Sequence, residues 1–587
     1  MGEPIYISSA GLNAGPKNLP HPSPRKDKNF KIVFVMYNIL STERMSVMLL
    51  SALAKKYFPQ VECDVIVWSD GRFEERIKDH KPDIIAYSTM TGEHSYYLSI
   101  AKEVKTIEKK IGKKIFQIMG GPHCTFAPEV LQGSALDAIG VGECDEAWVE
   151  LLSALEAGRS INGISNIVTQ ENFENTVKPS DMKKENYVKY RAINMTERTC
   201  KDPINHNGCL DYLPFLDWEL YIQKTGFEKT NAILKRTIMT RRGCPFPCTY
   251  CFNRVFNALY SGMGKTIHNY SIDRVIEECK WVGRQWPTEF WKIYDDIAFF
   301  SSKGKEGERL REFAEKWRRE INLPFFVLTR ADLVSHDPDI LKILKEAGCR
   351  SCTMSIEGGN EYVRNRVLER SMPNEDIIAA HNLAWDLDIT TFSNVIFSVP
   401  TKDEEVKKYK LPEKSIDRDI ESVALAIKAK VHFLECPQLY PYPGTKLGKY
   451  CQDAGFFDGD LSKLQQSYQN ISPLDCFTDK EKRMSQNLAL LAMWCVYLGS
   501  RENPFIRKTI SPLFFNFTTG FLIKLPWLWC TKLYFIMYDL LQQWLCVAEI
   551  YRPKYRSPFT AIKIGFWERL RYEYTKQFPK ALKRGKA

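Results

Sequence analysis

The sequence predicts an α/β protein made of an N-terminal doubly wound domain, a central partial (β/α)6 barrel and a C-terminal, mainly helical region. Two observations predict this class. Apolar runs of strand length alternate with amphipathic stretches from Lys31 to about Leu155, and the same alternation returns from Lys235 to about Cys451. Because a chain of 587 residues is long enough for two to four domains, the two series can form separate folding units.

The first series predicts a Rossmann-like, doubly wound domain over residues 31–155. Its candidate buried strands are Ile32 to Met36, Val61 to Trp68, Ile84 to Tyr87, Ile115 to Met119 and Ala138 to Val141. Sheets of this kind bind their ligands beyond the carboxyl ends of the strands. Residues 1–30 are rich in Gly, Pro, Asn and Lys and have no apolar segment typical of a signal peptide, so we expect a flexible leader.

Three of these predicted strand ends carry distinctive turns. The fourth strand runs into Gly120-Gly121-Pro122-His123, the fifth into Gly142-Glu143, and the third into Ser88-Thr89. Glycine tolerates positive φ and lets a ligand approach the backbone closely. We therefore expect a ligand site at these turns.

The second series predicts six βα units over residues 235–451, a TIM-type barrel that does not close. The candidate strands are Thr237 to Thr240, Glu289 to Tyr294, Pro324 to Thr329, Ser351 to Ser355, Thr391 to Phe397 and Val431 to Leu439. Barrels of this kind place their active sites at the carboxyl ends of the strands. Residues 156–234, between the two series, are irregular, and we expect an ordered linker with little chemistry.

Three cysteines follow the first barrel strand with the spacing C-x3-C-x2-C: Cys244, Cys248 and Cys251. Four-iron clusters normally take four cysteine ligands, so a loop with three would leave one iron open to a cofactor or substrate. A zinc loop or three buried thiols are the alternatives. Zinc usually has a fourth Cys or His at short spacing, whereas the nearest histidine, His268, is distant and isolated.

At this motif the chain resembles the radical S-adenosylmethionine (radical SAM) superfamily, whose signature C-x3-C-x-aromatic-C has Tyr250 in its aromatic position. The resemblance implies that the three cysteines hold a [4Fe-4S] cluster. It also implies that the fourth iron binds S-adenosylmethionine, which one electron cleaves to a 5'-deoxyadenosyl radical. An external reductant of the flavodoxin or ferredoxin type is expected as a partner.

Further barrel strands end in residues that fit the same family. After the second strand, Asp295 and Asp296 suit the amino group of S-adenosylmethionine or a helix cap, and the resemblance favours the first for Asp295. After the third, Arg330 offers a cation to a carboxylate or a developing charge, with a rim salt bridge as the alternative. After the fourth, Glu357 resembles the family's strand-end acid for the ribose or amino acid moiety. Near the end of the fifth, Ser398 marks an adenine contact, in a motif that matches loosely.

The N-terminal turns, taken together, resemble the cobalamin-binding domain that precedes the barrel in class B radical SAM enzymes. This resemblance makes Ser88, Thr89, Gly120, Gly121, Pro122, His123, Gly142 and Glu143 the expected cobalamin contacts. The D-x-H-x-x-G motif that places a histidine on cobalt in many cobalamin domains is not in the sequence. We therefore expect neither His94 nor His123 to be a cobalt ligand.

Composition indicates the cellular compartment of the protein and its relation to membranes. Seventeen cysteines, scattered and odd in number, disagree with a disulfide scaffold and favour a reducing cytoplasm. Lys524, Lys532 and Asp539 interrupt the apolar runs of the C-terminal region, 452–587, where we expect a helical cap and no transmembrane helix. Eleven Lys or Arg against two Asp or Glu in residues 551–587, with interleaved aromatics, suit an anionic membrane surface or a helix docked on its own protein.

Together these features predict a cobalamin-dependent radical SAM enzyme, with C-methylation of an unactivated carbon through methylcobalamin as the favoured reaction. A cyclase or rearrangement enzyme with the same cofactors, and a non-catalytic cobalamin carrier or sensor, are the alternatives. A methylthiotransferase needs three more cluster cysteines, but Cys63, Cys124 and Cys144 lie on separate strands and turns. The substrate expected is a small or lipid-like molecule, and no nucleic-acid partner is expected.

Overall fold

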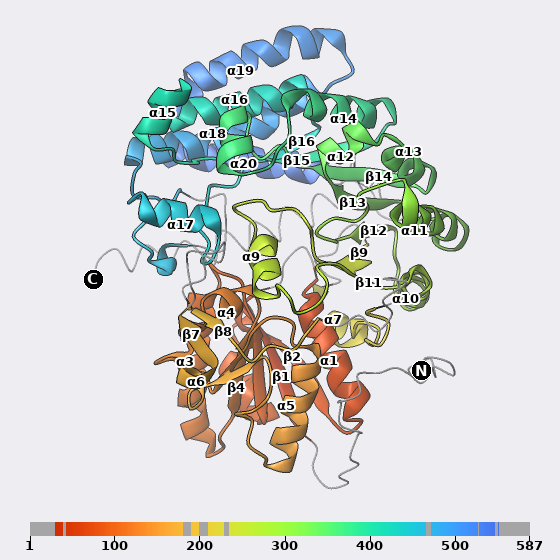
Figure 1. Ribbon diagram of the computed structural model, residues 1–587, viewed down its shortest axis with the longest axis vertical. Helices are drawn as coiled ribbons and strands as arrows, with labels where there is room; N and C mark the ends of the chain where they lie inside the picture. Colours follow the sequence, from red (N-terminus) through yellow and green to blue (C-terminus); the bar gives the residue numbers. More distant parts are fainter. Residues whose placement is uncertain are drawn as a thin grey trace.

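Two six-stranded sheets form the centres of two successive α/β domains (Figure 1). The structure is a computed structural model and describes residues 30–38, 43–179, 190–198, 209–227, 234–464, 471–525, 528–545 and 550. The basic segment 551–587, which suits an anionic membrane surface or a helix docked on its own protein, lies outside the described residues.

The N-terminal sheet has the strand order β2-β1-β3-β4-β5-β6. Its strands are β1 (Lys31–Met36), β2 (Glu62–Val67), β3 (Ile84–Ser88), β4 (Phe116–Gly120), β5 (Ala138–Gly140) and β6 (Ile167–Thr169). The first five are parallel and coincide with the five predicted strands, which confirms the doubly wound domain. Because β1 lies between β2 and β3, the winding direction reverses there, and ligands of such sheets bind at this edge.

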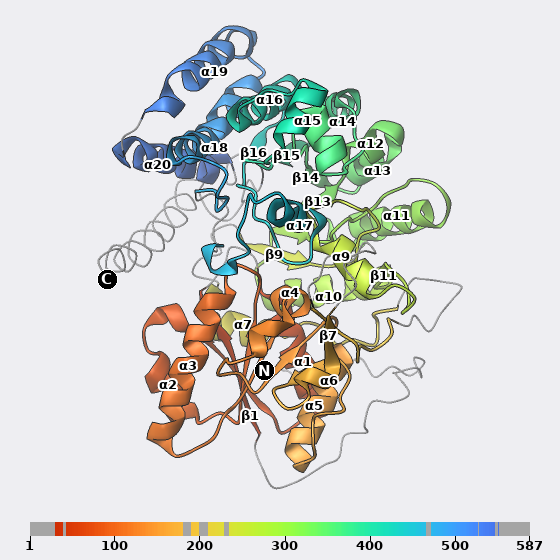
Figure 2. The same cartoon turned by 60° about the vertical axis from the view of Figure 1, so that its left-hand side comes forward.

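Helices cover both faces of this sheet (Figure 2). They are α1 (Met45–Tyr57), α2 (Phe73–His80), α3 (His94–Ile111), α4 (Pro122–Phe126) and α5 (Asp145–Ala157). Side chains of a strand alternate between faces, so Phe34 of β1 packs with α1 and α5, whereas its neighbours Val33 and Val35 pack with α2 and α3. Buried strands with both faces covered explain the continuous apolar runs in the sequence.

The segment predicted as a linker contributes more structure than we expect from its irregular sequence. Strand β6 pairs antiparallel with β5 and extends the first sheet beyond Leu155. The segment also holds α6 (Phe173–Thr176), the paired strands β7 (Val177–Pro179) and β8 (Tyr190–Ala192), and α7 (Trp218–Thr225), which packs on α1 and β2. These elements are three to eight residues long, too short for a periodic pattern to reveal.

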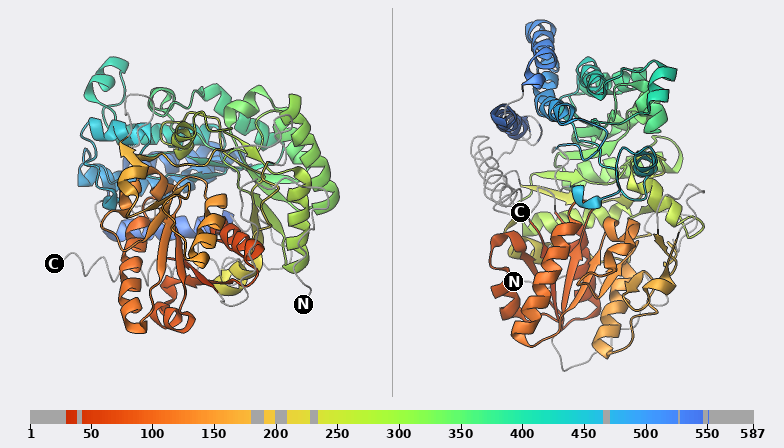
Figure 3. Two further views of the ribbon diagram at one scale, coloured as in Figure 1. Left: turned by 60° about the horizontal axis from the view of Figure 1, so that its bottom comes forward. Right: turned by 90° about the vertical axis from the view of Figure 1, so that its left-hand side faces the viewer.

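The second sheet is parallel throughout and has the order β16-β15-β14-β13-β12-β9. Its strands are β9 (Lys235–Ile238), β12 (Phe290–Ile293), β13 (Phe325–Thr329), β14 (Cys349–Met354), β15 (Thr390–Asn394) and β16 (Phe433–Glu435). All six predicted strands are present, and β9 and β16 remain at opposite edges, so the barrel is partial as expected. The right-hand view in Figure 3 shows the N-terminal domain (orange) beneath this barrel (green).

Helices follow the barrel strands and continue to the C-terminal region. They are α9 (Phe252–Leu259), α10 (Ile272–Gln285), α11 (Gly304–Lys316), α12 (Ala331–His336), α13 (Asp339–Glu346), α14 (Asn374–Asp386), α15 (Asp403–Tyr409), α16 (Ser415–Lys428), α17 (Lys446–Asp453), α18 (Asp479–Gly499), α19 (Ser511–Gly520) and α20 (Leu528–Trp544). A short pair of strands, β10 (Arg241–Arg242) and β11 (His268–Asn269), flanks the cysteine loop. Helix α18 packs against α16 and the edge strand β16, so it extends the barrel sideways. Among the described residues, no helix combines the length and apolarity needed to cross a bilayer.

We expect Asp217→Ala to destabilise the junction of α7 and α1. Asp217 caps α7 by accepting from the Leu220 amide at 3.2 Å, and it accepts from the Ser51 hydroxyl at 2.5 Å. The loss of a cap and of a hydrogen bond to a buried hydroxyl predicts about 2 kcal/mol, measurable by hydrogen exchange of the α7 amides. The matched control, Asp273→Ala, removes an exposed pair with Lys316 and should change exchange little.

Candidate functional site

Carboxylates from the end of β12 hold the cysteine loop. Asp295 accepts from the Thr240 amide at 2.7 Å, from the Thr240 hydroxyl at 2.6 Å and from the Arg241 amide at 3.2 Å. Asp296 accepts from the Gly243 amide at 3.3 Å. Burial raises the pKa of Asp295 to about 6 although these donors oppose the rise. Both carboxylate oxygens of Asp295 therefore fix the start of the loop at Thr240, four residues before the first cysteine.

The three cysteines are on one loop and influence one another electrostatically. Cys248 is buried, while Cys244 and Cys251 are half-buried, and Cys251 immediately precedes α9. Burial raises the pKa of Cys244 to about 11 and that of Cys251 further still. Within the described ranges, no three His, Cys, Asp or Glu side chains converge on a single metal ion. A four-iron cluster binds each thiolate at a different iron, so its ligands need not converge on one point.

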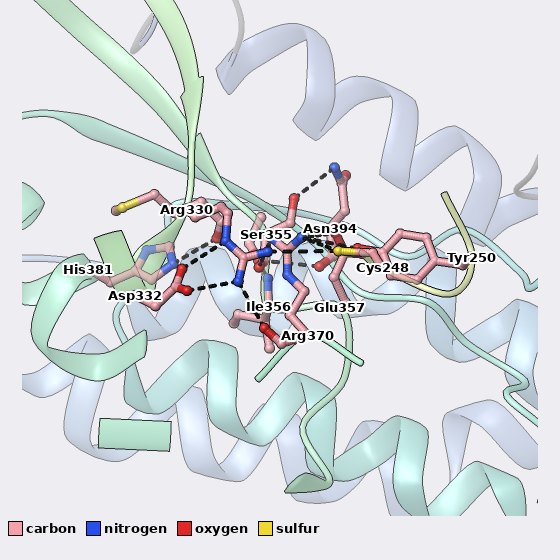
Figure 4. A network of polar contacts seen from close by, with 12 residues as sticks. Cys248, Tyr250, Arg330, Asp332, Ser355, Ile356, Glu357, Arg370, His381 and Asn394 are labelled. Carbon is pink, nitrogen blue, oxygen red and sulfur yellow. Dashed lines mark hydrogen bonds and ion pairs between the residues drawn. The ribbon is translucent and has the colours of Figure 1, made fainter. Parts of the chain in front are cut away.

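Two buried guanidinium groups converge on the Sγ atom of Cys248 (Figure 4). The Nη1 atoms of Arg330 and Arg370 both lie 3.8 Å from this sulfur. Arg330 is held in place by two hydrogen bonds to Asp332, at 3.0 and 2.8 Å, and its guanidinium lies 3.9 Å from the centre of the Phe246 ring. Arg330 thus faces the cluster loop as well as forming the predicted alternative, a local salt bridge.

Arg370 also connects the loop to Glu357. Its Nη1 donates to the Tyr250 hydroxyl oxygen at 3.1 Å and lies 3.8 Å from the Glu357 carboxylate. Burial raises the pKa of Glu357, and the charge of Arg370 opposes this rise. Glu357 has a positive φ of 65°, which is rare for a glutamate and turns its side chain out of the line of β14. The predicted residues Glu357, Tyr250, Arg330 and Cys248 are therefore brought together.

Ser398 lies in a separate, buried polar group. Its backbone N–H donates to Asp419 on α16, and its hydroxyl donates to Gln438 at 2.7 Å and contacts Ser485 of α18 at 3.1 Å. Ser398 has a φ of 57°. Burial raises the pKa of Asp419 to about 7. The predicted adenine contact of Ser398 stays a prediction, and its hydroxyl is already used within the protein.

On the facing domain, the predicted turns pack with almost no free space. Gly121 has a φ of 105°, and a Cβ atom there would overlap the carbonyl oxygen of Thr89. Gly142 has a φ of 71°, and a Cβ atom would overlap the hydroxyl of Tyr260. Both turns thus require glycine for conformation and for space. Because glycine has no side chain, these turns present only backbone atoms at the carboxyl edge of the sheet.

One ion pair joins these turns to the barrel, and a second joins them to the segment between the two domains. Arg242, two residues before Cys244, contacts Asp145 at the start of α5 at 2.5 Å. Arg198 contacts Glu143 at 3.1 Å. Burial would raise the pKa of Glu143, but the charges of Arg242 and Arg198 lower it below its usual value. The strand end that carries Gly142 and Glu143 is therefore fixed to the strand end that carries the cysteine loop.

A cavity of about 330 Å³ lies between the two domains. Five of the predicted cobalamin contacts line it: Ser88, Gly120, Gly121, Gly142 and Glu143. Leu49 and Trp148 contribute apolar walls from α1 and α5, and Met239 and Arg242 line it from the barrel side.

The remaining predicted contacts, Thr89, Pro122 and His123, are not among the lining residues. His123 is buried, its Nδ1 lies 3.0 Å from the Thr91 hydroxyl, and its ring stacks on that of His94 at 4.0 Å. Burial lowers the pKa of His123 to about 3, so the imidazole is neutral near pH 7. Cys124 and Cys144 are at this edge, but Cys63 begins β2 at the opposite edge, which separates the three further cysteines that a methylthiotransferase would need.

Comparisons with known proteins identify both domains. The profile of the radical SAM superfamily matches residues 238–410, and that of the B12-binding domain matches residues 42–152. This chain is a cobalamin-binding radical SAM protein. Its cofactors are a [4Fe-4S] cluster, S-adenosylmethionine and cobalamin, and the three loop cysteines and the glycine-lined cavity suit the first and the last of these.

Relatives of this cobalamin-binding radical SAM protein include enzymes of two kinds. It is 24% identical over 378 residues to the uncharacterized methyltransferase PH0819 of Pyrococcus horikoshii, covering 64% of this chain and 70% of that protein. It is 24% identical to the anaerobic magnesium-protoporphyrin IX monomethyl ester cyclase of Rubrivivax gelatinosus, over 49% of this chain and 46% of the cyclase. The fold matches that of the radical S-adenosylmethionine methyltransferase TsrM from Kitasatospora setae, with a TM-score of 0.55, 12% identity, and coverage of 88% of this chain and 100% of that one.

Several residues of this site were not predicted from the sequence. Arg242 makes the ion pair between the two domains, Arg198 of the segment between them pairs with Glu143, and the Glu143 amide donates to the Tyr260 hydroxyl at 2.9 Å. Arg370 reaches Cys248 and Tyr250 from a loop between β14 and α14. The position of Arg242 next to the cysteine motif could have indicated a role at the site. No short-range pattern connects Arg370 with the cysteine loop, which lies more than a hundred residues earlier.

We expect Arg370→Gln to lower the reduction potential of the reconstituted cluster. A guanidinium beside a cysteine sulfur stabilises the reduced, more negative cluster, so its removal should shift the midpoint downwards by on the order of 60 mV, a tenfold change in the one-electron equilibrium. A redox titration followed by electron paramagnetic resonance measures the shift. Arg311→Gln is the control, because Arg311 of α11 donates to the Ser302 carbonyl oxygen and not to the cysteine loop. An unchanged potential in Arg370→Gln would contradict the role.

We expect Gly121→Ala to weaken cobalamin binding at least tenfold, because the added Cβ overlaps backbone at the Thr89 turn and the turn must move. Cobalamin retained after gel filtration, measured by its absorbance, reports the change. Gly163→Ala is the matched control, since a Cβ there meets nothing within 4 Å. Equal cobalamin retention by the two variants would show that the turn is not part of the site.

Proposed function

We propose that this enzyme transfers a methyl group to an unactivated carbon of a small organic substrate. The proposal rests on the pairing of a radical SAM barrel with a B12-binding domain and on a relative named as a methyltransferase that is matched over 70% of its length. When bound, the cluster and S-adenosylmethionine supply the radical that activates a substrate carbon, and cobalamin supplies the methyl group.

The single observation that supports this function best is the position of Arg242. This residue lines the cavity between the domains, pairs with Asp145 of the cobalamin-binding domain, and stands two residues before Cys244. The loop for the cluster and the cavity for cobalamin therefore share one wall. Two cofactors that act in turn on one substrate need this proximity.

Within this proposal, the protein's own residues position the cysteine loop and bind S-adenosylmethionine. Asp295 acts as a positioning residue, because its carboxylate oxygens bind the loop backbone and the Thr240 hydroxyl. Arg330 and Arg370 hold Cys248 and screen its charge. Glu357 is the acid placed to accept hydrogen bonds from S-adenosylmethionine, since it lies at a strand end beside Arg370.

The alternative function is cyclisation or rearrangement without methyl transfer, and the similarity to a cyclase over about half of that relative favours it. A small-molecule substrate and an external one-electron reductant belong to either function. A lipid-like substrate and a membrane contact through the basic C-terminal segment also stay proposals, because that segment lies outside the described residues.

Methyl-deuterated S-adenosylmethionine distinguishes the two functions without knowledge of the substrate. The full chain, reconstituted anaerobically with iron, sulfide and cobalamin and given a low-potential reductant, is expected to release S-adenosylhomocysteine and to place the deuterated methyl group on cobalamin. Cys248→Ala is expected to abolish 5'-deoxyadenosine, because the cluster loses a ligand. Mass spectrometry detects all three products. Formation of 5'-deoxyadenosine without S-adenosylhomocysteine or labelled cobalamin would favour the alternative function.

A further inference from the structure

The helix α19 presents its large apolar side chains to solvent. The helical turn η6 (Ile506–Ile510) runs directly into α19, so residues 506–520 form one continuous helical segment. Four large apolar side chains along this segment and at its two ends are more than half exposed: Phe505, Leu513, Phe517 and Phe521, at 64, 63, 53 and 52%. The fully buried side chains of α19 are Ser511 and Thr518, and Phe514 and Phe515 are partly buried against the hydrophobic core. The helix is therefore apolar on its solvent face as well as on its inner face, whereas the outer face of a surface helix is normally polar.

The four exposed side chains form a single stripe, which we call the apolar stripe. Leu513, Phe517 and Phe521 are four residues apart and so share one face of the helix, and Phe505 lies at the start of the segment, eight residues before Leu513. The rings of Phe517 and Phe521 stack at 5.5 Å. Contiguous exposed apolar surface of this kind marks an interaction site.

Basic residues outnumber acidic ones around the apolar stripe. Between Glu502 and Asp539 the sequence has four basic residues, Arg507, Lys508, Lys524 and Lys532, and no Asp or Glu, while the exposed Glu502 lies three residues before Phe505. Lys508 and Lys524 are exposed near the two ends of the segment. An apolar stripe with basic residues around it matches the surface of a bilayer that contains anionic lipids, where apolar side chains enter the acyl boundary and basic ones meet headgroups.

The position of α19 leaves this surface accessible. Figures 1 and 2 show α19 at the end of the molecule opposite the cobalamin-binding domain. The segment is about 22 Å long at 1.5 Å per residue, shorter than the roughly 30 Å hydrocarbon core of a bilayer. Its geometry therefore suits a helix lying in the plane of the membrane surface.

We propose that the apolar stripe docks the protein on the surface of an anionic lipid bilayer. A bilayer accepts a flat row of aromatic and aliphatic side chains without a complementary groove. A protein partner or a second copy of the chain would have to supply an acidic surface to match the basic residues. Between Glu502 and Asp539 the sequence has no Asp or Glu, so the same segment of a second copy offers no acidic side chain for such a match. This inference is independent of the proposed reaction.

Co-sedimentation with vesicles tests the inference and needs no cofactor or turnover. The full chain is expected to bind vesicles of phosphatidylcholine with phosphatidylglycerol, to bind pure phosphatidylcholine vesicles at least tenfold more weakly, and to be released by rising salt. Phe517→Glu with Phe521→Glu is expected to weaken binding to the anionic vesicles at least tenfold. Ile193→Glu is the matched control, since Ile193 is also about half exposed but lies far along the chain from α19.

Three results would overturn the inference. The first is equal vesicle binding by the double phenylalanine variant and the unmodified chain. The second is equal binding to anionic and zwitterionic vesicles, which would leave the basic residues without a role. The third is self-association in analytical ultracentrifugation that the phenylalanine variant removes, because the apolar stripe would then be a contact between copies. Circular dichroism of each variant shows that its helices are intact, which is expected because the substituted side chains are exposed.

Discussion

The ion pair between Arg242 and Asp145 is the contact on which the arrangement of both cofactor sites depends. It joins Arg242, at the start of the cysteine loop, to Asp145 in the first turn of α5. A second ion pair, between Arg198 and Glu143, lies beside it. Partly buried pairs of this kind contribute little net stability, but the removal of one partner leaves an uncompensated charge. Here the ion pairs matter for geometry, because they fix the position of the turn after β5 relative to the cysteine loop after β9.

Much of the fold was predictable because parallel, doubly covered strands produce uninterrupted apolar runs. All eleven predicted strands are present, with bounds shifted by a few residues. Strand β6 was not predicted because three residues at an edge leave too little pattern, and it adds the only antiparallel pairing of the described part of the first sheet. Helices of the C-terminal region were predicted as a cap, but α18 packs beside β16.

The site was less predictable than the fold, and the reasons are physical. The sequence places Asp295 at a strand end, but it does not show that the carboxylate turns back to bind the loop of the neighbouring strand. It gives no indication of Arg370, which reaches the cysteine sulfur through a loop with positive φ at both Glu369 and Ser371. Such conformations are costly for residues other than glycine and persist where the surrounding contacts fix them. Side-chain direction, more than element type, was the missing information.

The buried polar group around Ser398 makes α18 part of the barrel. Ser485 of α18 donates to Asp419 and contacts Ser398, so a helix beyond the predicted barrel boundary at Cys451 completes the hydrogen bonds of a barrel strand end. A chain truncated at Cys451 would leave Asp419 and Ser398 facing water and expose the apolar side of β16. The barrel therefore packs as a larger unit than the residues 238–410 that its family profile matches, because α18 (Asp479–Gly499) completes one of its edges.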